Sequence, residues 1–270
     1  MERSRLEMIV AGCDVGSLTA KAVILGDDRV LAVRIGKVKS RPEISAREIM
    51  EEALKDAGLR MKDIECSIGT GYGGKQVPFA GEAVSEIACH ARGALWLLPS
   101  VRTVIDIGGQ DCKVMKLDRD GRIVRFATND KCAAGTGRFM EVMARVLNVG
   151  LDELGDLSGR AKKQLNLAST CTVWAQAEVI QKINEGERVE DIGGAVNNAM
   201  ANRIVILANT VGVENDVCMT GGVSKNKGVV KGLERLLDIR VKKLRLDPQA
   251  VGALGAAVIA GERRKGGGEQ

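Results

Sequence analysis

Two of the seven cysteines in this 270-residue chain, Cys132 and Cys171, each precede a segment with helical periodicity. Small residues follow Cys132, and apolar residues spaced three and four apart come next. A similar apolar pattern follows Cys171 directly. A thiolate at a helix N-terminus gains from the helix dipole, which lowers its pKa and favours metal binding. Both are candidate metal ligands, although an arbitrary pair of cysteines would more often serve packing alone.

Two strand–turn–strand patterns form a second candidate set. The first starts at Asp14 and continues through Gly16 to Lys21, and the second starts at Asp106 and continues through Gly108. The amides of such a turn can face a phosphate. Because the pattern occurs twice, the sequence predicts an internal duplication.

Two glycine-rich stretches also follow predicted strands. Gly221 and Gly222 form a turn that lets the backbone approach a flat or phosphorylated ligand. The stretch 69–76 nearly matches a P-loop, but Gln76 replaces the hydroxyl that holds Mg²⁺ and no apolar helix follows. We therefore reject a P-loop NTPase.

Composition narrows the classes of function. The chain has two Trp, one Tyr and three Phe, too few for the stacking platforms that bind single-stranded nucleic acid, and we expect no such partner. The single histidine, His90, excludes histidine-rich zinc sites and is expected to be a packing or surface residue. Neither a signal peptide nor a membrane span is expected. Seven cysteines without secretion predict a cytoplasmic protein that does not bind membranes.

Two sets of elements must position these residues. Strands are predicted over 8–15, 22–25, 30–35 and 64–68, and helices over 45–57 and 82–97. Ser45 and Glu48 are expected to form a capping box. In the second half, strands are predicted over 101–107, 112–117, 123–127, 217–219 and 241–244, and helices after each candidate cysteine and over 157–161, 192–211 and 228–236. A last helix begins at Gln249 and carries small residues that favour close helix packing.

Together these motifs resemble the actin, sugar-kinase and heat-shock-chaperone ATPase superfamily. They resemble the activator ATPases of 2-hydroxyacyl-CoA dehydratases more closely, over about residues 8–260. The ATP-binding subunits of benzoyl-CoA reductase are similar but match less well. The segments that carry the resemblance are Asp14–Ser17, Ile105–Asp111, Asn129–Phe139, Ser169–Val173 and Met219–Val223.

The resemblance implies an α/β fold of two duplicated actin-like (ribonuclease H-like) subdomains. Each would contain a mixed five-stranded sheet flanked by helices. The N-terminal subdomain is expected over residues 1–98 and is completed by the C-terminal helix, 249–262. The second subdomain is expected over 99–248, and residues 263–270 are expected to be a flexible tail.

The resemblance also implies an oxygen-sensitive homodimer that shares one 4Fe–4S cluster across its two-fold axis. ATP hydrolysis would drive one low-potential electron from ferredoxin or flavodoxin into a partner dehydratase or reductase. Cys132 and Cys171 become the cluster ligands. The ligand count agrees, because a cubane takes four thiolates and a dimer supplies two from each chain.

The resemblance assigns nucleotide roles residue by residue. The nucleotide would be ATP or ADP; Asp14 and Asp106 match the carboxylates that hold Mg²⁺ through water, and Gln110 would orient the attacking water. The phosphate-binding loops comprise Gly16, Ser17, Leu18, Thr19, Ala20, Lys21, Gly108 and Gly109. Glu141 would meet the ribose, Gly221 and Gly222 the nucleotide, and Gln249 the region near the base.

This sequence departs from the family at a few places. Leu18 stands where a small hydroxyl residue is usual. Cys13 and Cys112 stand where apolar residues are usual, and we expect them to pack as small hydrophobes, as we do Cys66, Cys89 and Cys218.

Two other functions remain open on the same fold. One is a small-molecule kinase, for which Asp111 beside Gln110 could supply the base. The other is a non-enzymatic ATP-gated scaffold. A brown colour and a cluster absorption band after anaerobic purification would separate the activator from both. The acyl-CoA substrate of the partner is not encoded in this chain.

Overall fold

The computed structural model describes residues 8–129, 132–168 and 171–266, which form two compact units. Unit 1 comprises Met1–Ser100 and Leu244–Gln270, and unit 2 comprises Val101–Lys243. The sequence predicted the boundaries between the two subdomains after residues 98 and 248. No helix in the described ranges combines the length and the apolar character needed to cross a membrane.

Unit 1 is built on a five-stranded mixed sheet of order β3-β2-β1-β4-β5. Strands β1, β2 and β3 form an antiparallel meander, whereas β4 and β5 continue parallel to β1. The strands are β1 (Ile9–Val15), β2 (Thr19–Gly26), β3 (Arg29–Lys37), β4 (Cys66–Thr70) and β5 (Glu82–Ala83), and the helices are α1 (Pro42–Ala57), α2 (Glu86–Leu97) and α8 (Val251–Gly266).

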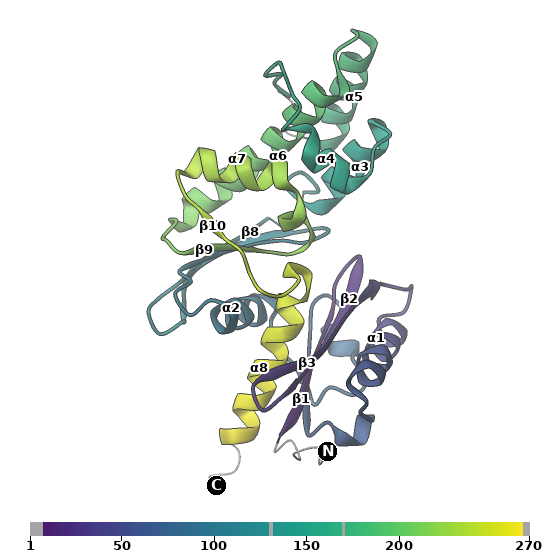
Figure 1. Cartoon of the computed structure of the whole chain (residues 1–270), viewed down its shortest axis with the longest axis vertical. Coiled ribbons are helices and arrows are strands. Elements are labelled where there is room, and N and C mark those ends of the chain that lie inside the picture. Colours follow the sequence, from purple (N-terminus) through teal and green to yellow (C-terminus); the bar gives the residue numbers. More distant parts are fainter. Residues whose placement is uncertain (1–7, 130–131, 169–170, 267–270) are drawn as a thin grey trace. The chain divides into compact units, whose positions relative to one another are not determined.

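Strand periodicity divides the core of unit 1 between the two faces of its sheet. Ala11, Cys13 and Val15 of β1 pack in one cluster with α1, while Val10 packs in another with α8. Figure 1 shows α1 and α8 on opposite sides of the sheet. The small residues of α8 pack closely on α2, as expected, because a Cβ at Gly255 would overlap the carbonyl of Cys89.

Unit 2 repeats this architecture with sheet order β10-β9-β6-β7-β8. Its strands are β6 (Thr103–Ile107), β7 (Cys112–Leu117), β8 (Ile123–Asn129), β9 (Val217–Thr220) and β10 (Val241–Lys242). Its helices are α3 (Gly137–Val146), α4 (Leu151–Leu157), α5 (Thr172–Asn184), α6 (Val189–Val211) and α7 (Lys227–Leu237). Within this unit, α6 and α7 pack side by side along the sheet, and α3, α4 and α5 gather at one end (Figure 1).

The two sheets therefore correspond strand by strand. Read from the meander edge, β3-β2-β1-β4-β5 matches β8-β7-β6-β9-β10, with antiparallel and parallel pairs in the same places. A short 3₁₀ turn follows the matching parallel strand in each unit, η2 (Gly74–Gln76) after β4 and η3 (Gly222–Lys225) after β9. The predicted fold of two mixed five-stranded sheets flanked by helices is confirmed.

Several predicted boundaries are wrong for local reasons. Helix α1 begins at Pro42, not at Ser45, because proline is preorganised for the first helical position. Ser45 forms no capping box: its hydroxyl accepts from the Lys39 N–H and donates to the Arg41 carbonyl. Helix α2 begins only at Glu86, where Ser85 caps it and accepts a hydrogen bond from the amide of Ala88.

Two other helices are displaced from their predicted ranges. The short helix expected over 157–161 is α4, which ends where that range begins. Helix α8 starts at Val251 after a 3₁₀ turn (η4, Pro248–Ala250) and continues to Gly266, so residues 263–266 are helical and not part of a tail. Its last turn carries basic side chains, which interact favourably with the negative end of the helix dipole. One of them, Lys265, forms an ion pair with Asp28.

Candidate functional site

The first acidic hairpin joins β1 to β2. Asp14 is 1% exposed, and its Oδ2 lies 2.9 Å from Nζ of Lys21, its partner across the two strands. The turn closes where the Gly16 N–H donates to the Thr19 carbonyl at 3.0 Å. Asp14 Oδ1 is buried and has no hydrogen-bond partner within the described residues. A carboxylate oxygen in that position fits a water of hydrated Mg²⁺.

The rest of this hairpin is accessible to a ligand. Ser17, Leu18 and Thr19 are half-buried, and Ala20 is buried where β2 begins. The carbonyl of Leu18 accepts from the Val38 N–H, so the turn is tied to the end of β3 through its backbone. The backbone holds the loop even though Leu18 lacks a hydroxyl.

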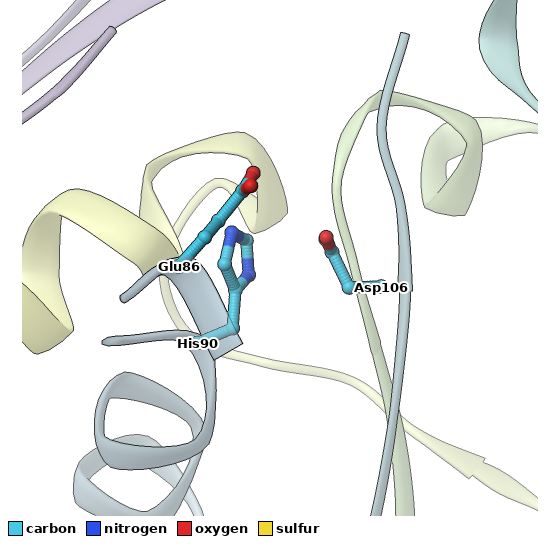
Figure 2. A group of neighbouring side chains, drawn as sticks. All are labelled: Glu86, His90 and Asp106. Atoms are coloured by element: carbon cyan, nitrogen blue, oxygen red, sulfur yellow. The ribbon is translucent and has the colours of Figure 1, made fainter. Parts of the chain in front are cut away.

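The second hairpin repeats these contacts between β6 and β7. Asp106, drawn in Figure 2, is 1% exposed and accepts a hydrogen bond from Thr220 Oγ1 at 2.8 Å. Lys113 Nζ lies 2.6 Å from Asp111 Oδ2 and 3.8 Å from Asp106 Oδ2. The Gly108 N–H donates to the Asp111 carbonyl at 2.9 Å, as the Gly16 N–H does to Thr19 in the first hairpin.

Sequence reasoning missed three residues of this repeated arrangement. Lys113 is the counterpart of Lys21, and both face an aspartate across an antiparallel pair. Thr70 and Thr220 occupy the matching register positions beside Asp14 and Asp106 on the parallel strands. The signal was present, since Lys113 follows Asp106 at the spacing that separates Lys21 from Asp14, and a Thr-Gly pair ends both parallel strands.

Each Thr-Gly pair brings backbone against its hairpin. Gly71 and Gly221 have φ of +84° and +82°, in the left-handed region that favours glycine. A Cβ at Gly71 would meet Asp14 Oδ1, and one at Gly221 would meet the Ile107 carbonyl and lie 3.0 Å from Asp106 Oδ1. The near match to a P-loop thus has another purpose. In the described chain, this stretch ends in the 3₁₀ turn η2, and β5 follows it instead of the helix that a P-loop requires.

We expect Gly71→Ala and Gly221→Ala each to lower the free energy of unfolding by about 2–4 kcal/mol, because left-handed strain and overpacking add. Gly186→Ala is the matched control, since Gly186 has φ +80° but a Cβ there meets nothing within 4 Å. It should cost only about 1–2 kcal/mol. Urea unfolding measures all three. Equal losses in the three variants would show that the hairpins tolerate the added methyl group.

The residues expected around the adenosine lie in both units. Glu141 is half-buried in α3, where its carboxylate pairs with Arg138 at 2.9 Å. In the same unit, Gly221 is buried and Gly222 exposed at the start of η3. Gln249 belongs to unit 1, where it is half-buried in η4 and its N–H donates to Asp247 Oδ1. Gln110 is exposed in the turn of the second hairpin beside half-buried Gly109.

The segment around Cys132 is tied to the second hairpin. Cys132 is exposed and lies between β8 and α3, so it does not itself cap the helix, contrary to expectation. The helix starts later because Gly135 turns the chain at φ +88° and the Asn129 amide donates to the Ala134 carbonyl at 2.8 Å. The Gly137 N–H then donates to the Gly108 carbonyl at 2.8 Å.

Cys171 is placed differently, because it is the N-cap residue of α5, as predicted. It is also exposed. Both carboxylate oxygens of Glu178 accept from the Ala168 N–H at 3.1 Å, which fixes the chain shortly before Cys171. The motif residues Asp130, Lys131, Ser169 and Thr170 lie outside the described residues.

The surroundings of these two thiols fit an anionic sulfur cluster. Beside Cys171, Thr172 Oγ1 is buried and has no hydrogen-bond partner in the described ranges, so a donor is available. Burial lowers the pKa of Arg203, whereas the charges of Cys132 and Cys171 act to raise it. The turn after Cys132 runs beside this residue, since a Cβ at Gly135 would lie 3.6 Å from the Arg203 Cβ. The donor set, two exposed thiols with a hydroxyl and a cation nearby, suits iron–sulfur chemistry.

The other five cysteines differ from this pair. Cys13, Cys89, Cys112 and Cys218 are buried, and Cys66 is half-buried. Burial raises the pKa of the Cys89 and Cys218 thiols to about 12 and raises that of Cys13 and Cys112 further. The buried four therefore stay protonated, and their expected packing role is confirmed.

The single histidine is also a packing residue. His90 and Glu86 lie one turn apart on α2 (Figure 2), and His90 is buried. A Cβ at Gly252 would lie 2.8 Å from His90 Nε2 and 3.2 Å from Asp14 Oδ2, so α8 needs glycine where it passes these side chains.

Comparison with known proteins agrees with the geometry. The model of the BadF/BadG/BcrA/BcrD ATPase family matches residues 11–260. The activator of lactoyl-CoA dehydratase from Anaerotignum propionicum is 46% identical over 261 residues, 94% of this chain and 98% of that protein. Two solved structures each have a TM-score of 0.92.

One of these structures is component A of (R)-2-hydroxyglutaryl-CoA dehydratase from Acidaminococcus fermentans, which is 40% identical; 96% of this chain and 100% of that chain are covered. The other is the activator of 2-hydroxyisocaproyl-CoA dehydratase from Clostridium difficile with bound ADPNP, which is 38% identical with 97% of each chain covered. The repeated acidic hairpins, the duplicated sheets and the match along nearly the whole sequence agree, and the chain belongs to the BadF/BadG/BcrA/BcrD ATPase family.

Proposed function

We propose that this protein is an ATP-hydrolysing iron–sulfur activator that passes one low-potential electron to a partner acyl-CoA dehydratase or reductase. The observation that carries the proposal is that Cys132 and Cys171 are both exposed and lead into α3 and α5, two helices that pack on each other. Relatives with 38–46% identity over nearly the whole chain are named dehydratase activators, which favours this function over a sugar kinase or a scaffold.

In this proposal, Cys132 and Cys171 bind one 4Fe–4S cluster together with the same two residues of a second copy. When bound, the cluster supplies one-electron redox chemistry. The Thr172 hydroxyl is available to donate to a sulfur, and Glu178 holds the chain that leads to Cys171. A site at the seam of a dimer is accessible, so we expect oxygen to bleach the protein. The electron donor is of the ferredoxin or flavodoxin class.

The two hairpins would bind ATP and Mg²⁺. Asp14 and Asp106 would hold the hydrated ion, while Lys21 and Lys113 balance charge beside these buried carboxylates. The turn amides after Gly16 and Gly108 would face the phosphates. Gln110 is exposed at the tip of its turn, where a neutral amide can orient the attacking water. Glu141, Gly221, Gly222 and Gln249 keep the adenosine roles assigned above.

Backbone hydrogen bonds within unit 2 would couple ATP hydrolysis at the second hairpin to the segment that carries Cys132. The first amides of α3, those of Gly137 and Arg138, donate to the carbonyls of Gly108 and Gly109 at 2.8 and 2.9 Å. A change in phosphate occupancy that moves this turn therefore moves the start of α3 and the chain that carries Cys132. Such coupling is reciprocal, so reduction of the cluster should change nucleotide affinity.

The test is electron delivery by the anaerobically purified protein. We expect a brown protein with about one cluster per dimer that reduces a dehydratase component of a related lactoyl-CoA system only when a reductant and ATP are both present. ADPNP, which is not hydrolysed, is the matched control and should not support turnover. An iron-free protein that transfers phosphate to a sugar hydroxyl would instead establish the kinase.

A further inference from the structure

Arg203 is held in place by an aromatic ring. It lies in the interior of α6, and its guanidinium carbon sits 4.3 Å from the ring centroid of Phe139, a fully buried residue of α3. A cation over an aromatic face at this distance is attracted to the ring. The stack therefore fixes a positive charge at the contact between α6 and the helix that follows Cys132.

The chain around both cysteines passes close to this residue. A Cβ at Gly135 would lie 3.6 Å from the Cβ of Arg203, so the turn after Cys132 runs against α6. Helix α5, which Cys171 caps, packs on both α3 and α6. The two thiols also act on the pKa of Arg203, opposing the effect of its burial. The cation of α6 thus lies against α3, and the helices that follow the two thiols pack on each other.

We propose that Arg203 supplies a positive charge that both cysteine ligands share, and that it thereby raises the reduction potential of the cluster. Arginine suits this role because its guanidinium stays protonated at any pH that the protein meets. The inference rests on the proposed function, and it makes Arg203 a positioning residue that acts through Cys132 and Cys171.

The change in charge on reduction explains why a nearby cation raises the reduction potential. One electron from a donor of the ferredoxin or flavodoxin class enters the site, and no proton is needed to accompany it. The cluster with four thiolates is a dianion before this step and a trianion after it. A nearby cation stabilises the trianion more than the dianion. With Arg203 in place, the resting protein accepts its electron from the donor more readily.

The first test uses the metal-free protein and does not depend on the cluster. Iodoacetate is an anion and iodoacetamide is neutral, so a local positive charge raises the ratio of their reaction rates with a thiol. We expect Arg203→Gln to lower that ratio at Cys132 and Cys171 by about threefold to tenfold. Arg203→Lys should retain most of it. Arg145→Gln, which removes an exposed charge from the last turn of α3, is the matched control and should not change it.

The second test measures the midpoint potential of the reconstituted protein by redox titration. Arg203→Gln should lower the equilibrium constant for reduction by about tenfold, which is about 59 mV for one electron. Arg203→Lys should lie close to the unmutated protein. If the glutamine variant does not fold, the unmutated protein still decides the matter, because its alkylation ratio at both cysteines should exceed that of an unstructured cysteine peptide.

The outcomes separate this inference from the proposed function. Alkylation ratios and potentials that do not change in Arg203→Gln would overturn the role of Arg203 while leaving the cluster in place. A protein that binds no iron would overturn the proposed function, and the alkylation ratios would still show whether Arg203 acts on the two thiols. A ratio for the unmutated protein equal to that of the peptide would also contradict the inference.

Discussion

Cys171→Ala is expected to remove essentially all iron from the protein, and Cys132→Ala is expected to do the same. A cubane that takes two ligands from each chain keeps only two thiolates in either mutant dimer. Iron per dimer should fall from about four atoms to almost none, with loss of the visible absorption band. The fold should survive, because both cysteines are exposed and neither belongs to a core cluster.

Cys66→Ala is the matched control, since this half-buried cysteine lies on β4 in unit 1. It should retain all iron. Mixed dimers, in which one chain is unmutated and the other carries Cys171→Ala, provide a sharper test. They keep three thiolates, so a shared cluster should be lost or unstable, whereas a cluster held within one chain would remain at half occupancy. A full cluster in either single variant would disprove the ligand assignment.

The duplication could be read from the sequence because it repeats a local pattern. A strand, an Asp-x-Gly turn and a second strand occur around Asp14 and again around Asp106, and each is contiguous in the chain. The glycines at Gly71 and Gly221 were visible as well. Their structural role could not be predicted, because it depends on which hairpin each glycine approaches after the chain has crossed the sheet.

Long-range pairing explains most of what the sequence did not reveal. Thr220 meets Asp106 only because β9 runs parallel to β6, more than a hundred residues later in the chain. Arg203 gives no signal in its own neighbourhood, since Phe139, Cys132 and Cys171 come from other elements. The misplaced starts of α1 and α3 have a local cause, namely a proline and a positive-φ glycine that override hydrophobic periodicity.

Asp106→Asn is expected to lower kcat for Mg²⁺-dependent ATP hydrolysis by about 10²–10³-fold, the loss typical when one group that stabilises transition-state charge is removed. The substitution preserves shape, and the new amide oxygen can still accept the hydrogen bond from Thr220. Lys113 keeps its closer partner, Asp111. The negative charge that would hold hydrated Mg²⁺ is lost, so the Mg²⁺ concentration needed for half-maximal turnover should rise.

Asp191→Asn shows whether that loss is specific. Asp191 is as deeply buried as Asp106, but its Oδ1 accepts hydrogen bonds from the backbone N–H groups of Lys162 and Lys163, which belong to neither hairpin. This variant should unfold at lower temperature yet hydrolyse ATP normally while folded. Rates are therefore measured below both unfolding transitions, across a series of Mg²⁺ concentrations. Turnover in Asp106→Asn within about twofold of the unmutated rate, at the same Mg²⁺ requirement, would mean that the phosphates and the metal bind elsewhere. A group that holds the ion in the transition state cannot be neutralised without slowing the reaction.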